Sequence, residues 1–490
     1  MLSNVITGQV SIPGDYFNRI DKMEDSTSLV FYASINRDYQ RKKFEVIDPY
    51  SSISFNSEYP RGYNDGAIWK GKGLTWELHA GFMGEIGKFS YTFLPNVFYT
   101  QNRDFQLASI VGNLNPFNYQ FAVNNTGIDW VQQYGDGSFV TFHPGQSEVC
   151  LTLGVFNASL SNQNYSNGPA IFNPILISRQ SGGFPHLKLG MSPTNITIRK
   201  INLGLFEAHL LYGLLSESDY YDDNDDNDLR YFNAIFLGYS PSFAPEVTFS
   251  FNKTLYKELD FFEVEDIISP ISIIDDGIID QDTLSPNDTF DQLASISMEW
   301  NLKKSNFRTW VEFAVNDFNG SSLKTFNEPE HARAYTVGLE KRFFTKNNTE
   351  IRVVYEHTNL VRSSTYLYRP NPPFYSHGVN KQGYTNRGQL LGAGIGPGGN
   401  SDHLEFQIVT PSRRYGILVQ RIEANKDYFI LNIQDTKRHD QEYSLGLYYQ
   451  QAFNRFELNF QSTIGRNINR YYADDISNIA LSTGLRYFLN

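Results

Sequence analysis

The chain lacks the features of a helical membrane protein and of a disulfide-bonded secreted protein. Its 490 residues include one cysteine, Cys150, so neither an intrachain disulfide nor a cysteine metal cluster can form. No apolar run reaches the roughly 18 residues that a transmembrane helix requires. The first ten residues lack the basic stretch followed by an apolar stretch that marks a signal peptide, and we expect that any such peptide has been removed.

Basic residues and catalytic motifs are also scarce. Lys and Arg total 41 against 53 Asp and Glu, so the formal net charge is −12, which argues against a nucleic-acid partner. The nine histidines belong to no HExxH pair, and the chain contains no Gly-x-Ser-x-Gly nucleophile elbow. We therefore expect no catalytic residues and no enzyme activity.

What the chain does have, above all from residue 291 to 489, is an alternation of apolar and polar side chains with a period of two. Phe456 and Phe460 alternate with Glu457 and Asn459, and the same pattern recurs at 307–315, 404–408 and 443–450. Successive side chains of a strand point to opposite faces, so each strand has one face suited to hydrocarbon and one suited to water. Six glutamates fall on the polar face: Glu299, Glu312, Glu340, Glu356, Glu405 and Glu457.

A soluble β-sandwich would also alternate, so the number and length of the segments matter. About 16–18 segments of about ten residues can be drawn, and aromatic residues make up 15% of the chain, as in barrels with aromatic girdles. No change of composition divides the chain. We predict one all-β domain over 1–490, a transmembrane antiparallel β-barrel in the outer membrane of a Gram-negative bacterium, in contact with lipid and lipopolysaccharide.

One early region has a different period. Between residues 103 and 135, apolar side chains recur at threes and fours, as at Phe105, Ile110 and Leu114. This spacing predicts a small helical element, which we place at the periplasmic mouth of the barrel. The alternative is one long loop that contains a short helix.

Two acidic stretches, 219–228 and 275–282, lie between strand candidates. Carboxylate oxygens at spacings of one or two residues suit Ca²⁺, although the spacing is not that of an EF-hand loop. The candidate calcium ligands are Asp222, Asp223, Asp225, Asp226 and Asp228. The alternative is a solvated extracellular loop that binds no metal, and no other cofactor is expected.

Three segments are rich in Gly, Asn and Pro beyond what strands require. The first is Tyr59–Gly73, the second includes 145–147, 161–164, 168–173 and 183–186, and the third includes 375–378, 383–389 and 391–401. In order and spacing they resemble the Wzi family of capsule-assembly outer-membrane proteins, particularly members from Bacteroidota. The resemblance implies an eighteen-stranded barrel with a small periplasmic helical bundle. It also implies a surface lectin that tethers capsular polysaccharide without synthesising or exporting it.

Sugar binding needs planar polar side chains for hydroxyl pairs and aromatic faces for the C–H surface of the ring. The candidate residues for contact with capsular or extracellular polysaccharide are Asn162, Gln163, Asn164, Tyr165, Asn173, Tyr375, Tyr384, Arg387 and Gln389. The same amides could instead bond one another or cap strand ends. Glycine-dense stretches such as Gly392–Gly399 allow close backbone approach, so they could fold into the lumen or form tight turns.

Two other functions remain open at this point. The inward glutamates, together with Arg308, Arg342 and Arg352, could line a passive or gated channel, because rings of charge set selectivity in pores. They could equally neutralise one another and keep the lumen plugged. The barrel could also be an accessory subunit of a larger outer-membrane complex.

Overall fold

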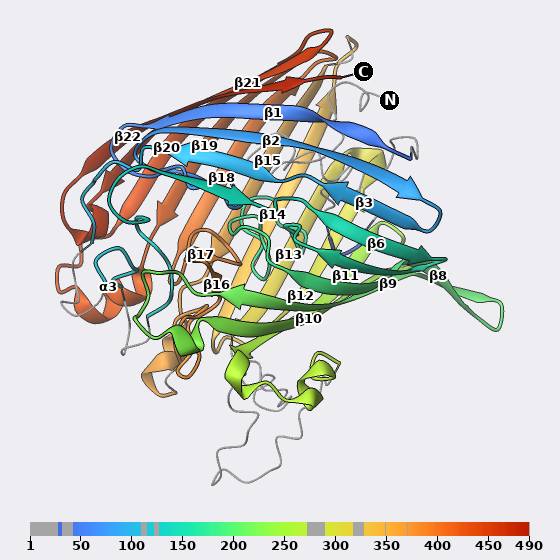
Figure 1. Ribbon diagram of the computed structural model, residues 1–490, viewed down its shortest axis with the longest axis horizontal. Coiled ribbons are helices and arrows are strands. Elements are labelled where there is room, and N and C mark those ends of the chain that lie inside the picture. Colours follow the sequence, from blue (N-terminus) through green and yellow to red (C-terminus); the bar gives the residue numbers. More distant parts are fainter. Residues whose placement is uncertain are drawn as a thin grey trace.

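The computed structural model describes residues 28–31, 43–108, 115–121, 127–271, 290–316, 328–347, 349–369 and 371–489. Within them the chain forms one closed antiparallel β-barrel (Figure 1). The wall strands are β1 (Glu45–Asn56), β2 (Gly73–Ile86), β3 (Phe89–Phe93), β4 (Asn96–Thr100), β5 (Phe139–His143), β6 (Glu148–Leu153), β7 (Phe156–Ser161), β8 (His186–Ile198), β9 (Ile201–Ser216), β10 (Leu229–Pro241), β11 (Val247–Glu258), β12 (Asp291–Leu302), β13 (Phe307–Asn316), β14 (Arg333–Phe344), β15 (Glu350–Asn359), β18 (Asn400–Val409), β19 (Arg413–Glu423), β20 (Gln441–Ala452), β21 (Phe456–Ile468) and β22 (Ile476–Tyr487).

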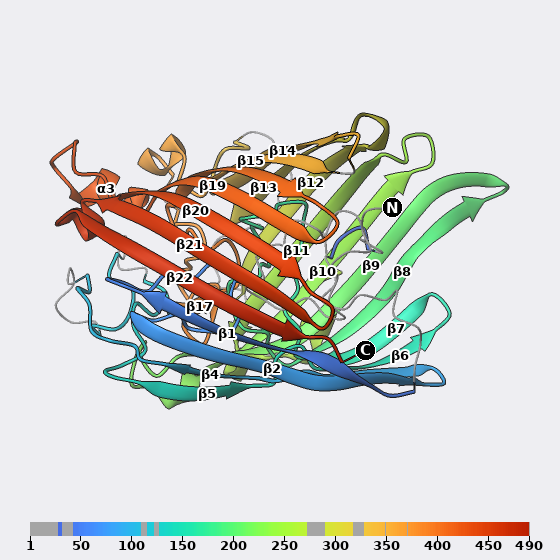
Figure 2. The ribbon, with the colours of Figure 1, turned by 90° about the horizontal axis from the view of Figure 1, so that it is seen from above.

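Four short strands combine into two wall strands. β3 and β4 pair with successive parts of β2, while β6 pairs with β3 and β5 pairs with β4. The break falls at Pro95, which has no backbone N–H to donate to the ladder. The barrel therefore has eighteen wall strands, as the family resemblance implied and within the range of 16–18 that the alternation allowed. Pairing of β1 with β22 closes it, and Figure 2 shows these strands side by side.

The alternation predicted from the sequence is confirmed in the wall. Phe456 and Phe460 are 43% and 42% exposed on the outer face, whereas Glu457 and Asn459 between them are buried on the inner face. Glu312, Glu340, Glu356 and Glu405 are likewise buried inside. An apolar outer face and a polar inner face are what a bilayer imposes on a barrel.

The two ends of the barrel differ in the length of their connections. At one end, here the short-turn end, hairpins such as β2–β3 and β8–β9 turn within two residues. The other, the long-loop end, carries the connections between β4 and β5, β15 and β18, and β19 and β20. The last of these contains α3 (Lys426–Asn432).

The remaining short elements are 3₁₀ turns and one hairpin. They are η1 (Asp225–Asn227), η2 (Leu259–Phe261), η3 (Val264–Ile267), η5 (Lys303–Ser305), η6 (Ser364–Leu367), η7 (Arg470–Tyr472), β16 (Thr385–Asn386) and β17 (Gln389–Leu390). Across the described ranges, no helix combines the length and the apolar character needed to cross a bilayer.

The helical element predicted over 103–135 is not found in the part of that region that the structure describes. Residues 103–108, 115–121 and 127–135 contain no helix, and the rest of the region lies outside the described residues. Asn118 and Val131 instead form an antiparallel bridge. The apolar residues at threes and fours pack as an irregular loop: Tyr119, Phe121 and Ile128 belong to the large apolar cluster inside the barrel. The region also lies at the long-loop end, which in such barrels is extracellular.

Two connections fold into the barrel and fill much of its lumen. They are 162–185, between β7 and β8, and the described part of 360–399, between β15 and β18; together we call them the plug. Almost every residue from 163 to 184 is buried. The plug packs on the inner faces of β9–β15, β18 and β19, and Leu211, Phe232 and Tyr256 carry apolar side chains into the lumen.

Buried polar groups of the wall hold the plug backbone. The Glu356 carboxylate accepts hydrogen bonds from the backbone N–H groups of Ile171, Phe172 and Asn173 at 2.7, 3.0 and 2.8 Å. The Arg308 guanidinium donates to the Pro169 carbonyl at 2.9 Å. Inward charges of the wall therefore satisfy loop backbone that would otherwise be buried without partners.

The three glycine-rich segments of the sequence meet in this plug. Gly66 of the first donates its N–H to the carbonyl of Arg179 in the second at 2.8 Å, and Ser178 donates to Leu391 of the third at 2.8 Å. Gly392 passes so close to its neighbours that an added Cβ would lie 2.2 Å from the Ile175 carbonyl oxygen. Glycine is required there by close backbone approach, as the sequence allowed.

Candidate functional site

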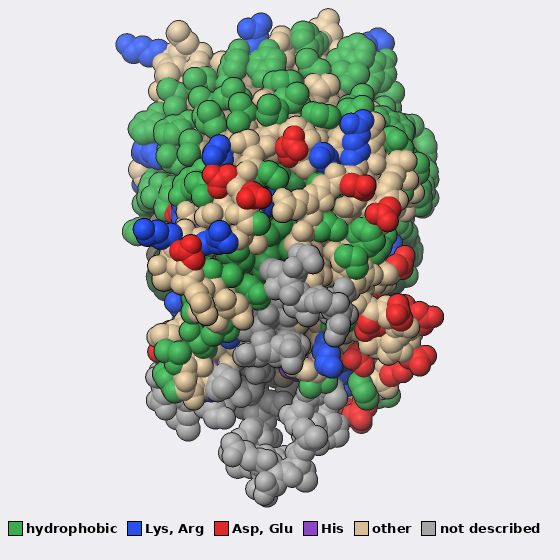
Figure 3. Space-filling view, turned by 90° about the vertical axis from the view of Figure 1, so that its left-hand side faces the viewer, with side chains coloured by type: hydrophobic (Ala, Val, Ile, Leu, Met, Phe, Trp, Pro, Cys, Tyr) green, Lys and Arg blue, Asp and Glu red, His purple; other side chains and the backbone are tan. Residues whose placement is uncertain are grey.

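A cavity of about 300 Å³ opens at the long-loop end, which we call the mouth cavity. Residues from six connections line it, and β19, β20 and β21 form its wall. The lining residues used below are Tyr59, Arg61, Asp65, Trp69, Lys70, Phe105, Tyr119, Trp130, Gln132, Gln180, Gln389, Gln420, Asn425, Asp440, Glu442, Asn467, Arg470 and Tyr471. Figure 3 looks at this end: charged side chains gather across the middle of the face, with hydrophobic ones around the periphery.

Aromatic rings supply flat apolar surface in the mouth cavity. Trp69 and Trp130 are half-buried and come from different loops. The Trp130 ring stacks on Tyr119, with ring centroids 5.3 Å apart. Trp69 meets Tyr134 edge-on at 5.0 Å and donates its indole N–H to Asn102 Oδ1 at 3.0 Å. Contacts with protein thus fix the orientation of both indoles before any ligand arrives.

Charged side chains tie the first glycine-rich segment to the wall. Arg61 forms an ion pair with Glu442 of β20, and its Nη2 donates to Gln420 Oε1 of β19 at 2.8 Å. The Tyr59 hydroxyl also donates to Glu442, at 2.9 Å. Lys70 pairs with Asp65 at 2.7 Å. Burial raises the pKa of Asp440, at the cavity rim, to about 6, although Tyr471 donates its backbone N–H to this carboxylate at 3.0 Å.

Uncharged amides complete the lining. Gln132, Gln180, Gln389, Gln420 and Asn425 all face the mouth cavity. An amide offers two donors and an acceptor, so such a surface matches the hydroxyl groups of a neutral polar ligand.

Of the residues predicted to contact polysaccharide, Gln389 lines the mouth cavity. Its side chain is also a structural link: Oε1 accepts the N–H of Gly182, and Nε2 donates to the carbonyl of Gly66, each at 3.0 Å. Arg387 lies at the same end, with an exposed side chain and a left-handed backbone (φ 50°). The Tyr134 hydroxyl donates to the Arg387 carbonyl at 2.7 Å.

The predicted tyrosines are interior residues of the barrel. Tyr375 and Tyr384 have no exposed surface and stack on each other, with centroids 5.8 Å apart. Tyr375 donates its hydroxyl to the Ile175 carbonyl at 2.7 Å. Tyr165 is buried, accepts from Lys188 at 2.8 Å and donates to Glu148 at 3.2 Å. In this conformation these rings stabilise the plug and offer no face to a ligand.

The predicted amides of the second segment also bond within the plug and its surroundings. Asn164 Oδ1 accepts from Gln146 at 2.7 Å, and Asn173 donates to Ser401 at 3.1 Å. Asn162 donates to the Gly183 carbonyl at 3.3 Å. The backbone N–H of Gln163 donates to Ser161 Oγ at 3.1 Å, while its side-chain Nε2 is buried without a partner among the described residues. In the structure these residues bond to neighbouring protein groups, as the alternative interpretation of the amides expected. Their contact with a ligand stays a prediction.

The main lining residues were therefore not among those singled out. Trp69 lies within the first glycine-rich segment, and Trp130 within the region expected to be helical. Their rarity could have pointed to them, because the chain has only 5 tryptophans and these two lie in connections between strands. Loop positions of large aromatic residues favour binding over packing.

The candidate calcium residues stand on the η1 loop at the long-loop end. Asp222, Asp223, Asp225 and Asp226 are exposed, and Asp228 is partly exposed. In the described ranges, no cluster of three or more Asp, Glu, His or Cys side chains has the arrangement of a metal site. Calcium binding by this loop stays a prediction. The second acidic stretch, 275–282, lies outside the described residues.

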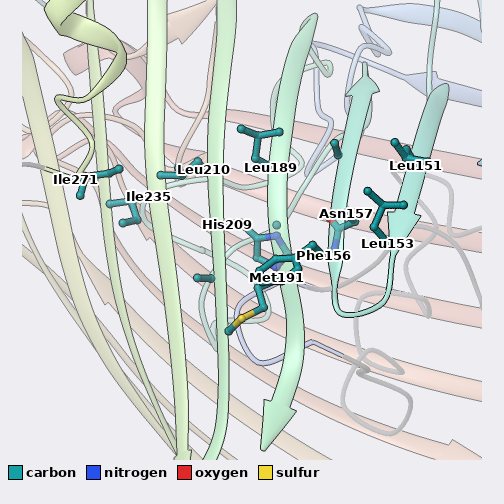
Figure 4. Close-up of a pocket in the computed structure, with 13 residues that line it drawn as sticks. Leu151, Leu153, Phe156, Asn157, Leu189, Met191, His209, Leu210, Ile235 and Ile271 are labelled. Carbon is teal, nitrogen blue, oxygen red and sulfur yellow. The ribbon is translucent and has the colours of Figure 1, made fainter. Parts of the chain in front are cut away.

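A larger cavity, about 500 Å³, lies against the outer wall across β6–β10 (Figure 4). Its lining is apolar, with Leu153, Phe156, Leu189 and Ile271 substantially exposed on that face. A groove of this chemistry on a lipid-facing wall suits acyl chains, so it is not a candidate for a sugar.

Neither a protein-family model nor a curated protein sequence matches the chain. Among solved structures, the fold is similar to Wzi of Escherichia coli, described as an outer-membrane protein involved in group 1 capsule assembly and a carbohydrate-binding β-barrel. The TM-score is 0.62 at 11% identity, over 99% of this chain and 100% of that one. OccAB2 of Acinetobacter baumannii (TM-score 0.41, 11% identity, 90% and 98% covered) and OccK11 of Pseudomonas aeruginosa (0.43, 9%, 92% and 98%) also match. At these identities the likeness to Wzi establishes the barrel fold.

Proposed function

We propose that this chain is a non-catalytic outer-membrane protein that binds capsular or other extracellular polysaccharide in the mouth cavity and tethers it to the cell. The observation that carries the proposal is the pair of oriented indoles, Trp69 and Trp130, in a cavity that is also lined by amides, charged groups and further aromatic rings. In outer-membrane barrels the short turns are periplasmic and the long loops extracellular, so this cavity faces the outside.

The chemistry of the cavity suits sugar rings. Indole faces can cover the C–H surface of a pyranose, and amides can bond its hydroxyl pairs. The cavity is open at one end of the barrel, and the plug occupies the lumen beneath part of it, so a polymer could lie across the mouth without passing through. The similarity to Wzi, a carbohydrate-binding barrel, supports the proposal.

Retention of a polymer does not require tight binding at each site. A repeating polysaccharide can engage many copies of the protein on one cell, and effective concentration converts weak single-site binding into strong retention. The acidic η1 loop lies at the same end, and we keep it as a candidate calcium bridge between the barrel and an anionic polymer or lipopolysaccharide.

The test is retention of polysaccharide by cells. A strain that lacks the gene should release polymer into the medium at unchanged total synthesis, and the wild-type gene should restore cell-bound polymer. The double variant Trp69→Ala, Trp130→Ala should restore it only in part, because both stacking faces are gone. Each indole lost should weaken single-site binding about two- to tenfold, since ring stacking contributes about 0.5–1.5 kcal/mol.

The matched control is Tyr368→Ala, which removes an exposed aromatic ring from a connection at the same end, outside the mouth cavity. This variant should restore retention fully. Equal retention by the deletion strain and the wild type would refute the tethering function.

A channel is the second candidate function. It is favoured by a small cavity of about 80 Å³ inside the lumen, between the first glycine-rich segment and β19–β22, which shares Arg61 and Gln420 with the mouth cavity. A steady ion conductance of the purified wild-type protein in planar bilayers would favour a channel. Absence of conductance would favour the tethering function. If the barrel is instead an accessory subunit of a larger complex, a partner protein should copurify with it after mild solubilisation.

A further inference from the structure

The mouth cavity contains one cationic group that differs from the others in its surroundings. Arg470 belongs to η7, between β21 and β22. Its guanidinium carbon lies 3.9 Å from the centroid of the Tyr59 ring, 4.5 Å from that of Tyr471 and 5.8 Å from that of Phe105. Three rings therefore enclose it, and cation–π contacts hold its plane in a fixed orientation.

The other two cations of the cavity are neutralised by neighbours. Arg61 pairs with Glu442, and Lys70 pairs with Asp65 at 2.7 Å. Arg470 donates from Nη2 to the Tyr471 hydroxyl at 2.8 Å. Its Nε is buried and has no hydrogen-bond acceptor among the described residues, and no described carboxylate lies within the 4.0 Å of an ion pair.

An unpaired acceptor accompanies this unpaired donor. Asn467, the residue before the last in strand β21, also lines the cavity. Its buried Oδ1 has no partner among the described residues. The nearby Asp440 carboxylate receives the backbone N–H of Tyr471 at 3.0 Å. The cavity thus keeps a cationic fork and an amide oxygen available together.

The Asp440 carboxylate offsets part of the Arg470 charge through space, but it accepts no hydrogen bond from the guanidinium, so the remaining donors can still receive an anion. A guanidinium presents its donors in a planar fork that matches a carboxylate, and such charge-assisted hydrogen bonds are about twice as strong as neutral ones. An uronic acid unit carries a carboxylate beside hydroxyl groups, which match the fork and the amide oxygen.

We infer that Arg470 receives the carboxylate of an acidic sugar, with Asn467 accepting from an adjacent hydroxyl, so that the polysaccharide held in the mouth cavity is a uronic-acid polymer. This inference rests on the proposed function and specifies its ligand class. Arg470 acts there as a specificity-determining residue.

The experiment is isothermal titration of the purified full chain in detergent. The ligands are oligomers of galacturonate, of mannuronate and of hyaluronan, each beside its carboxyl-reduced counterpart. At least one acidic oligomer should bind about tenfold or more tightly than its reduced form. Arg470→Gln should abolish that preference. Arg470→Lys, which keeps the charge but loses the fork, should retain only part of it.

The matched control is Arg466→Gln, four residues earlier, where the arginine is exposed and pairs with Asp475 at 2.9 Å outside the cavity. This variant should bind as the wild type does. If reduced and acidic oligomers bind equally, or if Arg470→Gln keeps the preference, the acidic-sugar inference fails while the binding function stands. If no oligomer of either kind binds, the proposed function fails as well.

Discussion

The two halves of the inner wall have the same alternating sequence and face different surroundings. On β13 and β15, the inward Glu312 and Glu356 meet plug backbone: Glu356 accepts three plug N–H groups, and Ile175 N–H lies 3.5 Å from Glu312. On β19 and β20, the inward Gln420 and Glu442 line the mouth cavity and contact the first glycine-rich segment through Arg61 and Tyr59. An inward polar residue can thus bind the chain itself or be left for a ligand, and the connections decide which.

The largest effect is expected from a variant that removes the hydrogen bonds between the plug and the wall. Glu356→Ala removes one acceptor from three buried N–H groups, so the closed plug should lose about 3 kcal/mol or more of stability. We expect a lower unfolding temperature and proteolytic cleavage within 162–185. Both are measured on the purified protein, and conductance in planar bilayers should appear.

The control is Glu405→Ala, on β18. This glutamate is equally buried and inward-facing, but it accepts a hydrogen bond from Gln407, at 2.9 Å, and holds no plug backbone. Its plug should remain protected from protease. Equal cleavage in both variants would show that loss of any inward carboxylate loosens the plug.

A smaller effect should follow from crowding the plug without removing a hydrogen-bond partner. In Gly392→Ala the new methyl carbon would lie 2.2 Å from the Ile175 carbonyl oxygen and 2.3 Å from the Tyr375 hydroxyl. Relief of this overlap should cost about 1–3 kcal/mol of stability, measured by thermal unfolding. Gly378→Ala, in the same connection, meets no atom within 4 Å and should unfold as the wild type does. Equal unfolding temperatures for both variants would contradict close packing at Gly392.

The smallest expected effect is a pH dependence on the cavity side. Burial raises the pKa of Asp440, and also that of Asp427 beside Arg362, to about 6, above the ordinary value near 4. A raised folded-state pKa favours the protonated folded form, so the stabilisation is full below pH 4 and is lost as pH rises toward 6. Amide hydrogen exchange of residues 424–440 should therefore quicken between pH 4 and 6, after correction for intrinsic rates.

Asp440→Asn should remove about half of this pH dependence, because Asp427 in the same connection continues to titrate. The change in local stability should reach about 3 kcal/mol at most for each carboxyl group. A variant with the full wild-type pH dependence would show that other groups control the opening of this connection.

Sequence patterns predicted the wall well where each face has one kind of neighbour. β21 alternates cleanly, because its outer face meets lipid and its inner face is polar. β10 does not, since most of its side chains are buried on both faces: Phe232 packs under the plug, and Asn233 on the outer side donates to the Asp266 carbonyl at 3.0 Å. Period-two patterns weaken wherever a loop covers a strand, because both faces then meet protein.

The candidate site was less accessible from the sequence. The three glycine-rich segments belong to connections that form the plug or line the mouth cavity, but most of the amides and tyrosines chosen from them bond within the plug and its surroundings. Which side of a loop faces inward depends on contacts between distant residues. Glu356 and Asn173 are 183 positions apart, and no local spacing indicates that they meet.

The sequence by itself determined the barrel, because a bilayer outside and polar contents inside impose alternation on every exposed strand, and about ten residues are needed to span. Only the tertiary structure decided that two connections fold inward, and that Trp69, Trp130 and Arg470 share one cavity. Those facts depend on packing and on hydrogen bonds between residues far apart in the chain. Local sequence propensity does not predict such contacts, because the polar groups of a loop residue find their hydrogen-bond partners only in the completed fold.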